Sequence, residues 1–131
     1  MAGTTVRDRS EVEGCFAEAC KRMGLTVTRA WIKSVQGWKK KFVFETLFTK
    51  ICGKGHPDIP SKVNAAYQHF QIVLEEHFSK SKVYPTKGCL ELFEYCKQNN
   101  VKIALTTGFY RKIITIILKK LGWNKGLDKN F

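Results

Sequence analysis

Apolar residues recur at helical spacing near the start of the chain, with polar side chains between them. From about residue 9 to residue 23 they fall three or four positions apart, which places them on one face of a helix. Ser10, with Glu13 three positions later, resembles a capping box, and Gly24 is a suitable C-terminal stop. The predicted inner residues of this helix are Val12, Cys15, Phe16, Ala19, Cys20 and Met23.

Three more helices follow from the same spacing. Thr28 is the expected cap of a short helix that ends near Val35, and Gly37 breaks it. Longer helices are expected over about 38–52 and from Pro60 or Ser61 to about Ser79. Their predicted inner residues are Val43, Leu47, Phe48, Ile51 and Cys52 in the first, and Val63, Ala66, Tyr67, Phe70, Val73, Leu74, His77 and Phe78 in the second. Facing apolar stripes on four helices predict a small bundle.

The pattern changes after Lys82. A turn over 84–88 leads into a helix that runs to about Asn99, with Cys89, Leu92, Phe93 and Cys96 on its inner side. Residues 101–106 are short and rich in aliphatic side chains, which predicts a strand. A helix over about 110–121, apolar on most sides, follows directly. A helix, a strand, a glycine-containing turn and a buried helix make one unit of a parallel α/β sheet.

The size of the chain suits one domain, or one small domain with part of another. It has 131 residues, of which 44% are apolar, an ordinary share for a globular protein. No apolar run approaches the ~20 residues that span a bilayer, and the polar N-terminus shows no secretory signal. The default expectation is a soluble cytoplasmic protein without a membrane partner.

The formal net charge is +12, and the excess is spread along the chain. Residues 1–60 hold 11 basic and 6 acidic residues, and residues 61–131 hold 12 and 5. Such a balance favours anionic partners, from phosphorylated metabolites to nucleic acid. It also fits a fragment whose acidic remainder is missing, so charge alone does not choose a function.

The cysteines and histidines do not suggest a metal site. The five cysteines are odd in number and fit no zinc spacing, which favours reduced thiols in the core. They are Cys15, Cys20, Cys52, Cys89 and Cys96. The three histidines, His56, His69 and His77, are scattered, and no pair shares metal-ligand spacing with a third donor.

Candidate chemistry lies where the predicted strand meets the next helix. Thr106, Thr107 and Gly108 end the strand and open the helix. Backbone N–H groups at a helix N-terminus and a hydroxyl at the strand tip can hold an oxyanion. Arg111, in the first helical turn, can add a charge-assisted hydrogen bond. Thr and Gly also occur in strand–helix turns for conformational reasons alone, so this segment by itself leaves both interpretations open.

The order of elements resembles the haloacid dehalogenase superfamily of phosphotransferases, and within it the phosphonatase-like hydrolases, relatives of phosphonoacetaldehyde hydrolase. The resemblance covers nearly the whole chain. It rests on Met1-Ala2-Gly3-Thr4-Thr5-Val6, on Gly37-Trp38-Lys39-Lys40, and on Tyr84-Pro85 through Trp123, above all Leu105-Thr106-Thr107-Gly108-Phe109-Tyr110-Arg111. It implies a partial, mostly helical Rossmann-like core with an inserted helical cap of the C1 type. The start of the core would be 1–8, the cap 9–82 and a further core segment 83–131.

The resemblance also implies roles for individual residues. The family's first motif, Asp-x-Ala-Gly-Thr-Thr, would put its nucleophilic Asp directly ahead of Met1. Ala2 matches the position where phosphatases of the superfamily carry an acid/base Asp, and its backbone carbonyl would be a Mg²⁺ ligand. Thr107 matches the hydroxyl that grips the phosphoryl group, with the Gly108 amide beside it. Thr106 and Arg111 would complete the phosphate site.

In phosphonatases a lysine of the cap forms a Schiff base with the aldehyde substrate. Lys40 is the best positional match, although Lys39 and Lys41 adjoin it and such a cluster also fits a solvated face. The histidine expected one helical turn later is replaced by Val43. The family's third and fourth motifs would lie downstream, where Asp128 is a lone carboxylate. The chain therefore resembles a Mg²⁺-dependent hydrolase of a small phosphonate or phosphate ester that is truncated at both ends and is expected to be inactive alone.

Two other functions compete with this one. A basic helical module could bind nucleic acid or another polyanion through Trp38, Lys39–Lys41, Lys119 and Lys120, but the lysines are dispersed and no recognised motif is present. Nucleic acid is therefore the less favoured partner. The chain could also be a non-catalytic partner that dimerises or pairs with a longer homologue through exposed strand edges.

Overall fold

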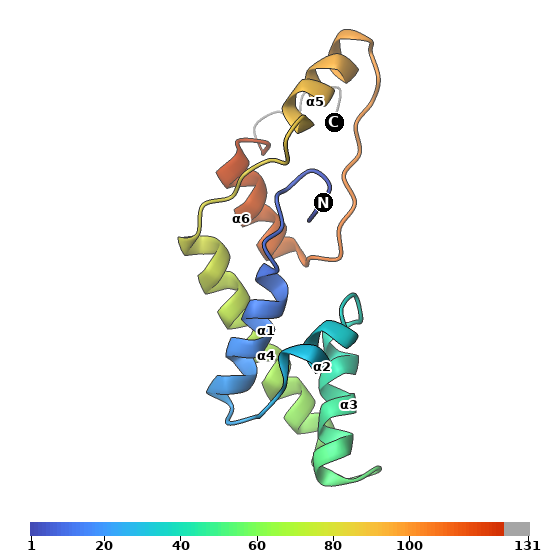
Figure 1. Cartoon of the computed structure of the whole chain (residues 1–131), viewed down its shortest axis with the longest axis vertical. Helices are drawn as coiled ribbons and strands as arrows, with labels where there is room; N and C mark the ends of the chain where they lie inside the picture. The colour runs from blue at the N-terminus through green and yellow to red at the C-terminus, as the bar shows by residue number, and fades with distance from the viewer. Residues whose placement is uncertain (125–131) are drawn as a thin grey trace. The chain divides into compact units, whose positions relative to one another are not determined.

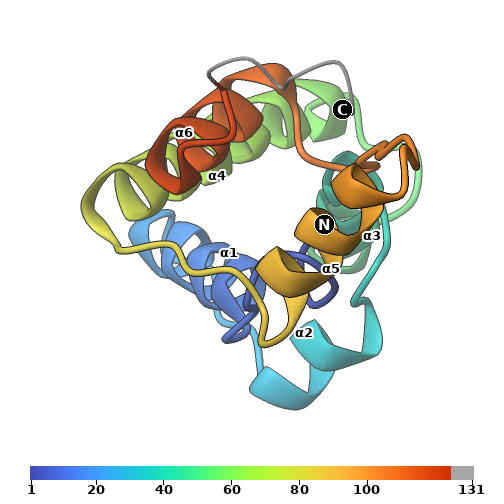
Figure 2. The same ribbon diagram turned by 90° about the horizontal axis from the view of Figure 1, so that it is seen from above.

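The computed structural model describes residues 1–124, and six helices make up its regular structure over that range (Figures 1 and 2). They are α1 (Glu11–Arg22), α2 (Arg29–Ser34), α3 (Lys40–Cys52), α4 (Ile59–Lys80), α5 (Cys89–Gln98) and α6 (Arg111–Leu121). The chain divides into two compact units. Ser10–His77 form the helical unit, and residues 1–9 with residues 78–124 form the described part of the terminal unit. None of the helices in residues 1–124 is long and apolar enough to cross a membrane.

The helical unit is built around an aromatic centre contributed by four of its helices. Phe16 of α1 is almost completely buried. Its ring centroid lies 4.8 Å from that of Phe44 and 6.1 Å from that of Phe70, and Trp31 of α2 lies 6.3 Å away. Clusters of this kind contribute much of the apolar burial in a small core. The predicted inner residues of α1 that the structure buries are Cys15, Phe16, Ala19 and Cys20.

Helix α3 turns a slightly different face inward from the one predicted. Val43, Leu47 and Phe48 are buried as expected, and so is Phe44, which the predicted stripe omitted. Ile51 was expected inside but is 58% exposed. It lies in the last turn, just before Gly53 ends the helix, where the buried stripe has already stopped. The end of α3 therefore contributes little to the core.

The two predicted N-caps have different outcomes. Thr28 caps α2 as expected, because its side-chain oxygen accepts a hydrogen bond of 3.1 Å from the Trp31 amide. The capping box at Ser10 was a wrong prediction. Ser10 adopts left-handed backbone angles, φ 60° and ψ 35°, and its side chain makes no cap hydrogen bond. The Ser10 carbonyl accepts a hydrogen bond from the Gly14 amide, as the carbonyl of an N-cap residue does.

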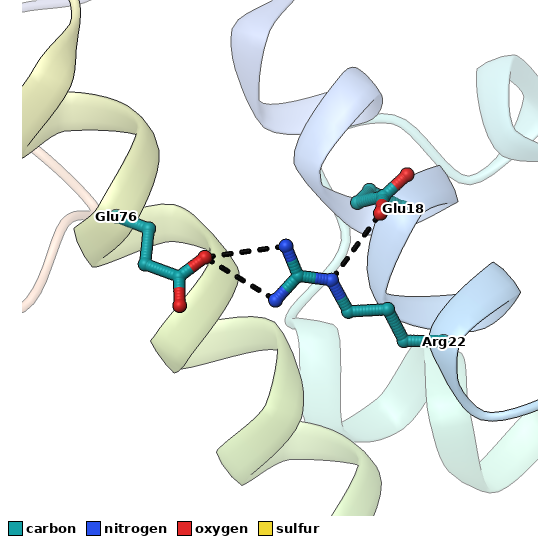
Figure 3. Close-up of polar contacts among 3 residues, drawn as sticks. All are labelled: Glu18, Arg22 and Glu76. Carbon is teal, nitrogen blue, oxygen red and sulfur yellow. Dashed lines mark hydrogen bonds and ion pairs between the residues drawn. The ribbon is translucent and has the colours of Figure 1, made fainter.

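A polar contact joins α1 and α4 on the surface of the helical unit. The Arg22 guanidinium donates from Nη1 and Nη2 to one carboxylate oxygen of Glu76, each at 3.2 Å, and from Nε to Glu18 at 3.2 Å (Figure 3). All three side chains are well exposed. Water and salt therefore screen the ion pairs, and their main effect is to fix the orientation of the guanidinium between the two helices.

The terminal unit packs around α6. Ile113 and Ile117 of this helix are fully buried, and the ring of Phe109 meets that of Phe78 edge to face, with centroids 5.6 Å apart. The Lys120 ammonium donates to the carbonyls of Ser79 and Ser81 at 2.8 and 2.6 Å. Because of these contacts the last turn of α4 and the residues to 82, which the sequence assigned to the insert, belong with the terminal unit.

Residues 101–106 were expected to form a strand, and that prediction was wrong. The segment runs between α5 and α6 without a ladder partner in the described part of the chain (Figure 1). The bridges found in residues 1–124 are isolated ones, between Ala2 and Val6 and between Val6 and Pro85. A strand exists only through hydrogen bonds to a neighbour, so aliphatic composition alone does not make one.

Helix α5, which precedes this segment, buries little of its predicted inner face. Cys89 is buried, but Phe93 and Cys96 are only half buried, and Leu92 is 58% exposed. An amphipathic helix needs an apolar surface to cover. Residues 101–106 form no sheet for α5 to cover, and the Phe93 ring packs instead on the Trp123 ring, with centroids 5.2 Å apart.

We predict that two phenylalanines two positions apart in α3 differ sharply in their contribution to stability. Phe44→Ala empties a fully buried site and should lower the free energy of unfolding by ~3–5 kcal/mol. Phe42→Ala, the matched control on the exposed side of the same helix, should change it by no more than about 0.5 kcal/mol. Urea denaturation followed by circular dichroism measures both. Equal losses would contradict the burial described for α3.

Backbone amides between α5 and α6 should exchange with solvent much faster than those of α3. The amides of Ile103, Ala104 and Leu105 have no strand ladder to protect them, whereas those of Val43 and Phe44 lie inside a helix. Native-state hydrogen exchange read by NMR gives the protection of each amide. Protection of residues 103–105 equal to that of α3 would show that a paired strand forms in solution.

Candidate functional site

The loop at the start of the chain is a tight backbone turn. The Met1 carbonyl accepts hydrogen bonds from the amides of Thr4, Thr5 and Val6, at 3.0, 2.9 and 3.1 Å. Gly3, with φ 74°, donates to the Val6 carbonyl at 2.8 Å. Other residues rarely adopt that backbone angle, so glycine suits this position. The sequence Met1–Val6 therefore has one compact conformation in which its polar backbone groups bond to one another.

This loop is held against the turn that precedes α5. The Arg7 amide donates to the Tyr84 carbonyl at 2.9 Å, and the Thr86 amide donates to the Thr5 carbonyl at 3.0 Å. The Thr86 hydroxyl donates to the Thr4 carbonyl at 2.5 Å. Thr86 thus binds two successive carbonyls of the loop. The sequence did not indicate this role, because a threonine in a turn carries no sign of a partner 82 positions away.

The loop also meets the end of the 101–106 segment. The terminal amine of Met1 donates to the Thr106 carbonyl at 2.9 Å, across 105 positions in the sequence. This bond brings Ala2, expected to offer its carbonyl to Mg²⁺, into the same unit as the Thr106-Thr107-Gly108 turn. The two small-residue segments that the sequence singled out therefore lie next to each other.

Helix α6 begins directly after this turn. The Thr107 hydroxyl accepts a hydrogen bond from the Phe109 amide at 3.2 Å, which fixes the direction of the side chain. Tyr110 is the N-cap in an extended conformation, its side chain makes no cap bond, and no acidic residue lies in the first turn. Thr107, Gly108 and Arg111 are all exposed. The positive end of the helix dipole, the exposed hydroxyl and a guanidinium therefore occur within five residues, which suits an anion.

Lys40 lies in the helical unit, at the first position of α3, and is half buried. Its ammonium lies 5.7 Å from the centroid of the Phe16 ring. Burial lowers the pKa of Lys40 below the usual value of 10.5, and the nearby Glu13 carboxylate partly offsets the shift. A lysine with a lowered pKa has more of the neutral amine, which is the nucleophilic form.

The predicted site residues are therefore divided between the two units. Ala2, Thr106, Thr107, Gly108 and Arg111 are in the terminal unit, and Lys40 is in the helical unit. Asp128 lies outside the described residues. Within residues 1–124, no group of three or more histidine, cysteine, aspartate or glutamate side chains could hold a metal ion.

The thiols are free, as the sequence predicted. Burial raises the pKa of Cys15 to about 11, with a smaller contribution from Glu11, and burial raises that of Cys20 to about 11. Thiolate is therefore scarce at neutral pH, and neither side chain is suited to act as a nucleophile. Their positions on the inner face of α1 agree with a role in packing.

The fold is similar to that of a solved hydrolase. No protein-family model and no curated protein matches the sequence. The crystal structure of a hydrolase from Pseudomonas syringae matches with a TM-score of 0.62 and 18% sequence identity, over 98% of this chain and 55% of that one. The chain thus spans about half the length of that hydrolase. The likeness shows the fold predicted from the sequence: a mostly helical, partial α/β core with an inserted helical cap.

The environment of Lys40 generates a prediction about its titration. Its amine should lose its proton below the usual pH of about 10.5, and Glu13→Gln should lower the pKa further, because the carboxylate favours the charged form. Since the unfolded chain holds this proton more tightly, Lys40 opposes folding at neutral pH, and stability should rise as the pH passes its lowered pKa. NMR of the Lys40 side chain follows the titration. An upward shift in Glu13→Gln would contradict the arrangement.

Proposed function

We propose that the terminal unit is the phosphate-binding part of a hydrolase of the haloacid dehalogenase superfamily, in the phosphonatase-like branch. The observation that supports this most is the hydrogen bond between the Met1 amine and the Thr106 carbonyl. It places the Met1–Val6 loop beside the Thr107-Gly108 turn, and these two segments carry the resemblance to the family. The substrate would be a small phosphonate or phosphate ester.

The start of α6 would hold the phosphoryl group. Because the Thr107 oxygen accepts from the Phe109 amide, its own proton can be donated to an anionic oxygen. The Gly108 amide and the first amides of α6 offer further donors on the side where the helix dipole is positive. Arg111 adds a planar, permanently charged donor in the first turn. Thr106 contributes its backbone, which the bond to Met1 fixes in place.

Magnesium enters this proposal through the resemblance alone. Mg²⁺ prefers six oxygen ligands, commonly including one or two carboxylates. Ala2 would supply only a backbone carbonyl, and residues 1–124 contain no close group of potential ligand side chains. The described residues therefore do not fit a magnesium site by themselves, and carboxylates from elsewhere would be needed.

In the family that the chain resembles, a helical cap excludes water from the substrate, and the helical unit would have that role. Lys40 is the residue of this unit best suited to react with a carbonyl group, because its pKa is lowered by burial and imine formation needs the neutral amine. Val43 occupies the position of the family's histidine. Schiff-base chemistry by Lys40 would therefore proceed without that partner, and a phosphate ester, which needs no imine, fits the chain equally well.

The phosphate site is tested by removing one hydroxyl. Thr107→Val keeps the shape of the side chain and loses the hydrogen bond to the anion. A hydrogen bond to a charged group is worth about 1.5–3 kcal/mol, so binding of methylphosphonate should weaken roughly 10- to 100-fold. Isothermal titration calorimetry at low ionic strength measures the dissociation constant.

Thr115→Val is the matched control for this experiment. It makes the same change eight positions later, inside α6, where the hydroxyl donates to the Arg111 carbonyl at 2.9 Å. Its affinity for methylphosphonate should stay close to that of the unmodified chain. Equal affinities of the Thr107 and Thr115 variants would show that the start of α6 does not bind the phosphoryl group.

A further inference from the structure

Two large aromatic side chains are exposed together at the start of α3. Trp38 is 45% exposed and Phe42 is 54% exposed. Their ring centroids lie 5.6 Å apart, with 39° between the ring planes. The core of the helical unit does not need them, because α3 already buries Val43, Phe44, Leu47 and Phe48 on its other side. The pair therefore presents aromatic surface to solvent.

The same stretch is strongly basic. Residues 29–54 contain seven lysines and arginines, and Glu45 is their only acidic residue. Lys39 and Lys41 lie between Trp38 and Phe42 in the sequence, and both are exposed. The Lys41 ammonium lies 5.2 Å from the centroid of the Tyr67 ring on α4, which holds it near one place. Aromatic rings and positive charge thus occur within one short stretch of this unit.

We propose that this surface, made of Trp38, Lys39, Lys41 and Phe42, binds single-stranded nucleic acid. Unpaired bases stack on exposed aromatic rings, and lysines beside the rings contact the phosphates that link the bases. Any base can stack on an aromatic ring, so the surface would bind without strong sequence preference. This function is independent of phosphate binding at α6, which uses residues of the terminal unit.

The residues at the start and on the outer side of α3 favour nucleic acid over an anionic membrane as the ligand. A helix that lies on a bilayer needs a broad apolar face to insert. Phe42 is followed on α3 by Glu45, an exposed carboxylate that interrupts any apolar face able to insert into a bilayer. Two rings are enough to stack one or two bases.

Lys120, which the sequence also suggested as a contact for nucleic acid, is not part of this surface. Its ammonium donates to the carbonyls of Ser79 and Ser81.

The proposal is tested by fluorescence anisotropy with a labelled oligothymidylate of about 20 nucleotides, longer than the ~4–16 nucleotides that a single-stranded binding fold covers. Trp38→Ala and Phe42→Ala should each weaken binding by roughly 5- to 100-fold, the loss expected for one stacked base. Trp38→Phe keeps a ring and should bind within a few-fold of the unmodified chain. Lys41→Ala should weaken binding and reduce the salt dependence by about one phosphate contact.

Tyr95→Ala is the matched control, because Tyr95 is also an exposed aromatic residue, 62% exposed, but it directly follows Glu94 and lies one helical turn after Glu91. Its affinity should be unchanged, and circular dichroism of each variant confirms the helices. Unchanged binding by both Trp38→Ala and Phe42→Ala would overturn the proposal, and so would an equal loss in Tyr95→Ala. Binding to phosphatidylserine vesicles without binding to the oligonucleotide would overturn it in favour of a membrane surface.

Discussion

Backbone hydrogen bonds between segments far apart in the sequence hold the candidate phosphate site together. The Met1 amine binds the Thr106 carbonyl, and Thr86 binds the carbonyls of Thr4 and Thr5. No strand ladder supports these contacts within residues 1–124. Each extended segment must satisfy its polar groups through individual bonds or through water. The geometry of the site therefore depends on a few hydrogen bonds. A substitution of Thr86 would remove the bond from its hydroxyl to the Thr4 carbonyl of the loop.

The helical unit faces no such constraint. Its helices satisfy their own backbone groups, and the rings of Phe16, Phe44 and Phe70 fill the space between them. Lys40 is part of this packing, because its ammonium lies over the Phe16 ring while burial lowers its pKa. The Lys40 amine proposed to react is thus also part of the core packing. A substitution that removes this amine would also change the surroundings of the Phe16 ring.

Much of the fold could be predicted from the sequence because helical stripes and caps are local signals. The spacing of apolar residues in α1 and α4 and the Thr28 cap depend on residues a few positions apart. The failures concern features that depend on distant partners or on one backbone angle. Residues 101–106 have strand composition but no ladder within the described chain, and Leu92 has no sheet to cover. Ser10 has a capping residue's side chain on a left-handed backbone.

In the candidate site, too, local patterns could be predicted and contacts between distant residues could not. Thr107, Gly108 and Arg111 could be identified because they are consecutive or nearly so at one helix start. The role of Thr86 could not, because it is set by bonds to a loop at the other end of the chain. The pKa of Lys40 is lowered by burial and partly restored by Glu13, and no spacing rule gives either contact. Sequence patterns thus located the residues proposed to bind an oxyanion and missed the groups that position them.

The charges of the helical unit are separated along its chain. Residues 29–54 are strongly basic, whereas residues 10–28 hold three acidic residues against two basic ones and residues 55–77 hold three against one. Arg22 is itself paired with Glu18 and Glu76 (Figure 3). The unit therefore has an electric dipole moment whose positive pole is the α2–α3 stretch. Within this unit, the long-range attraction of a polyanion is therefore strongest at the stretch that carries Trp38.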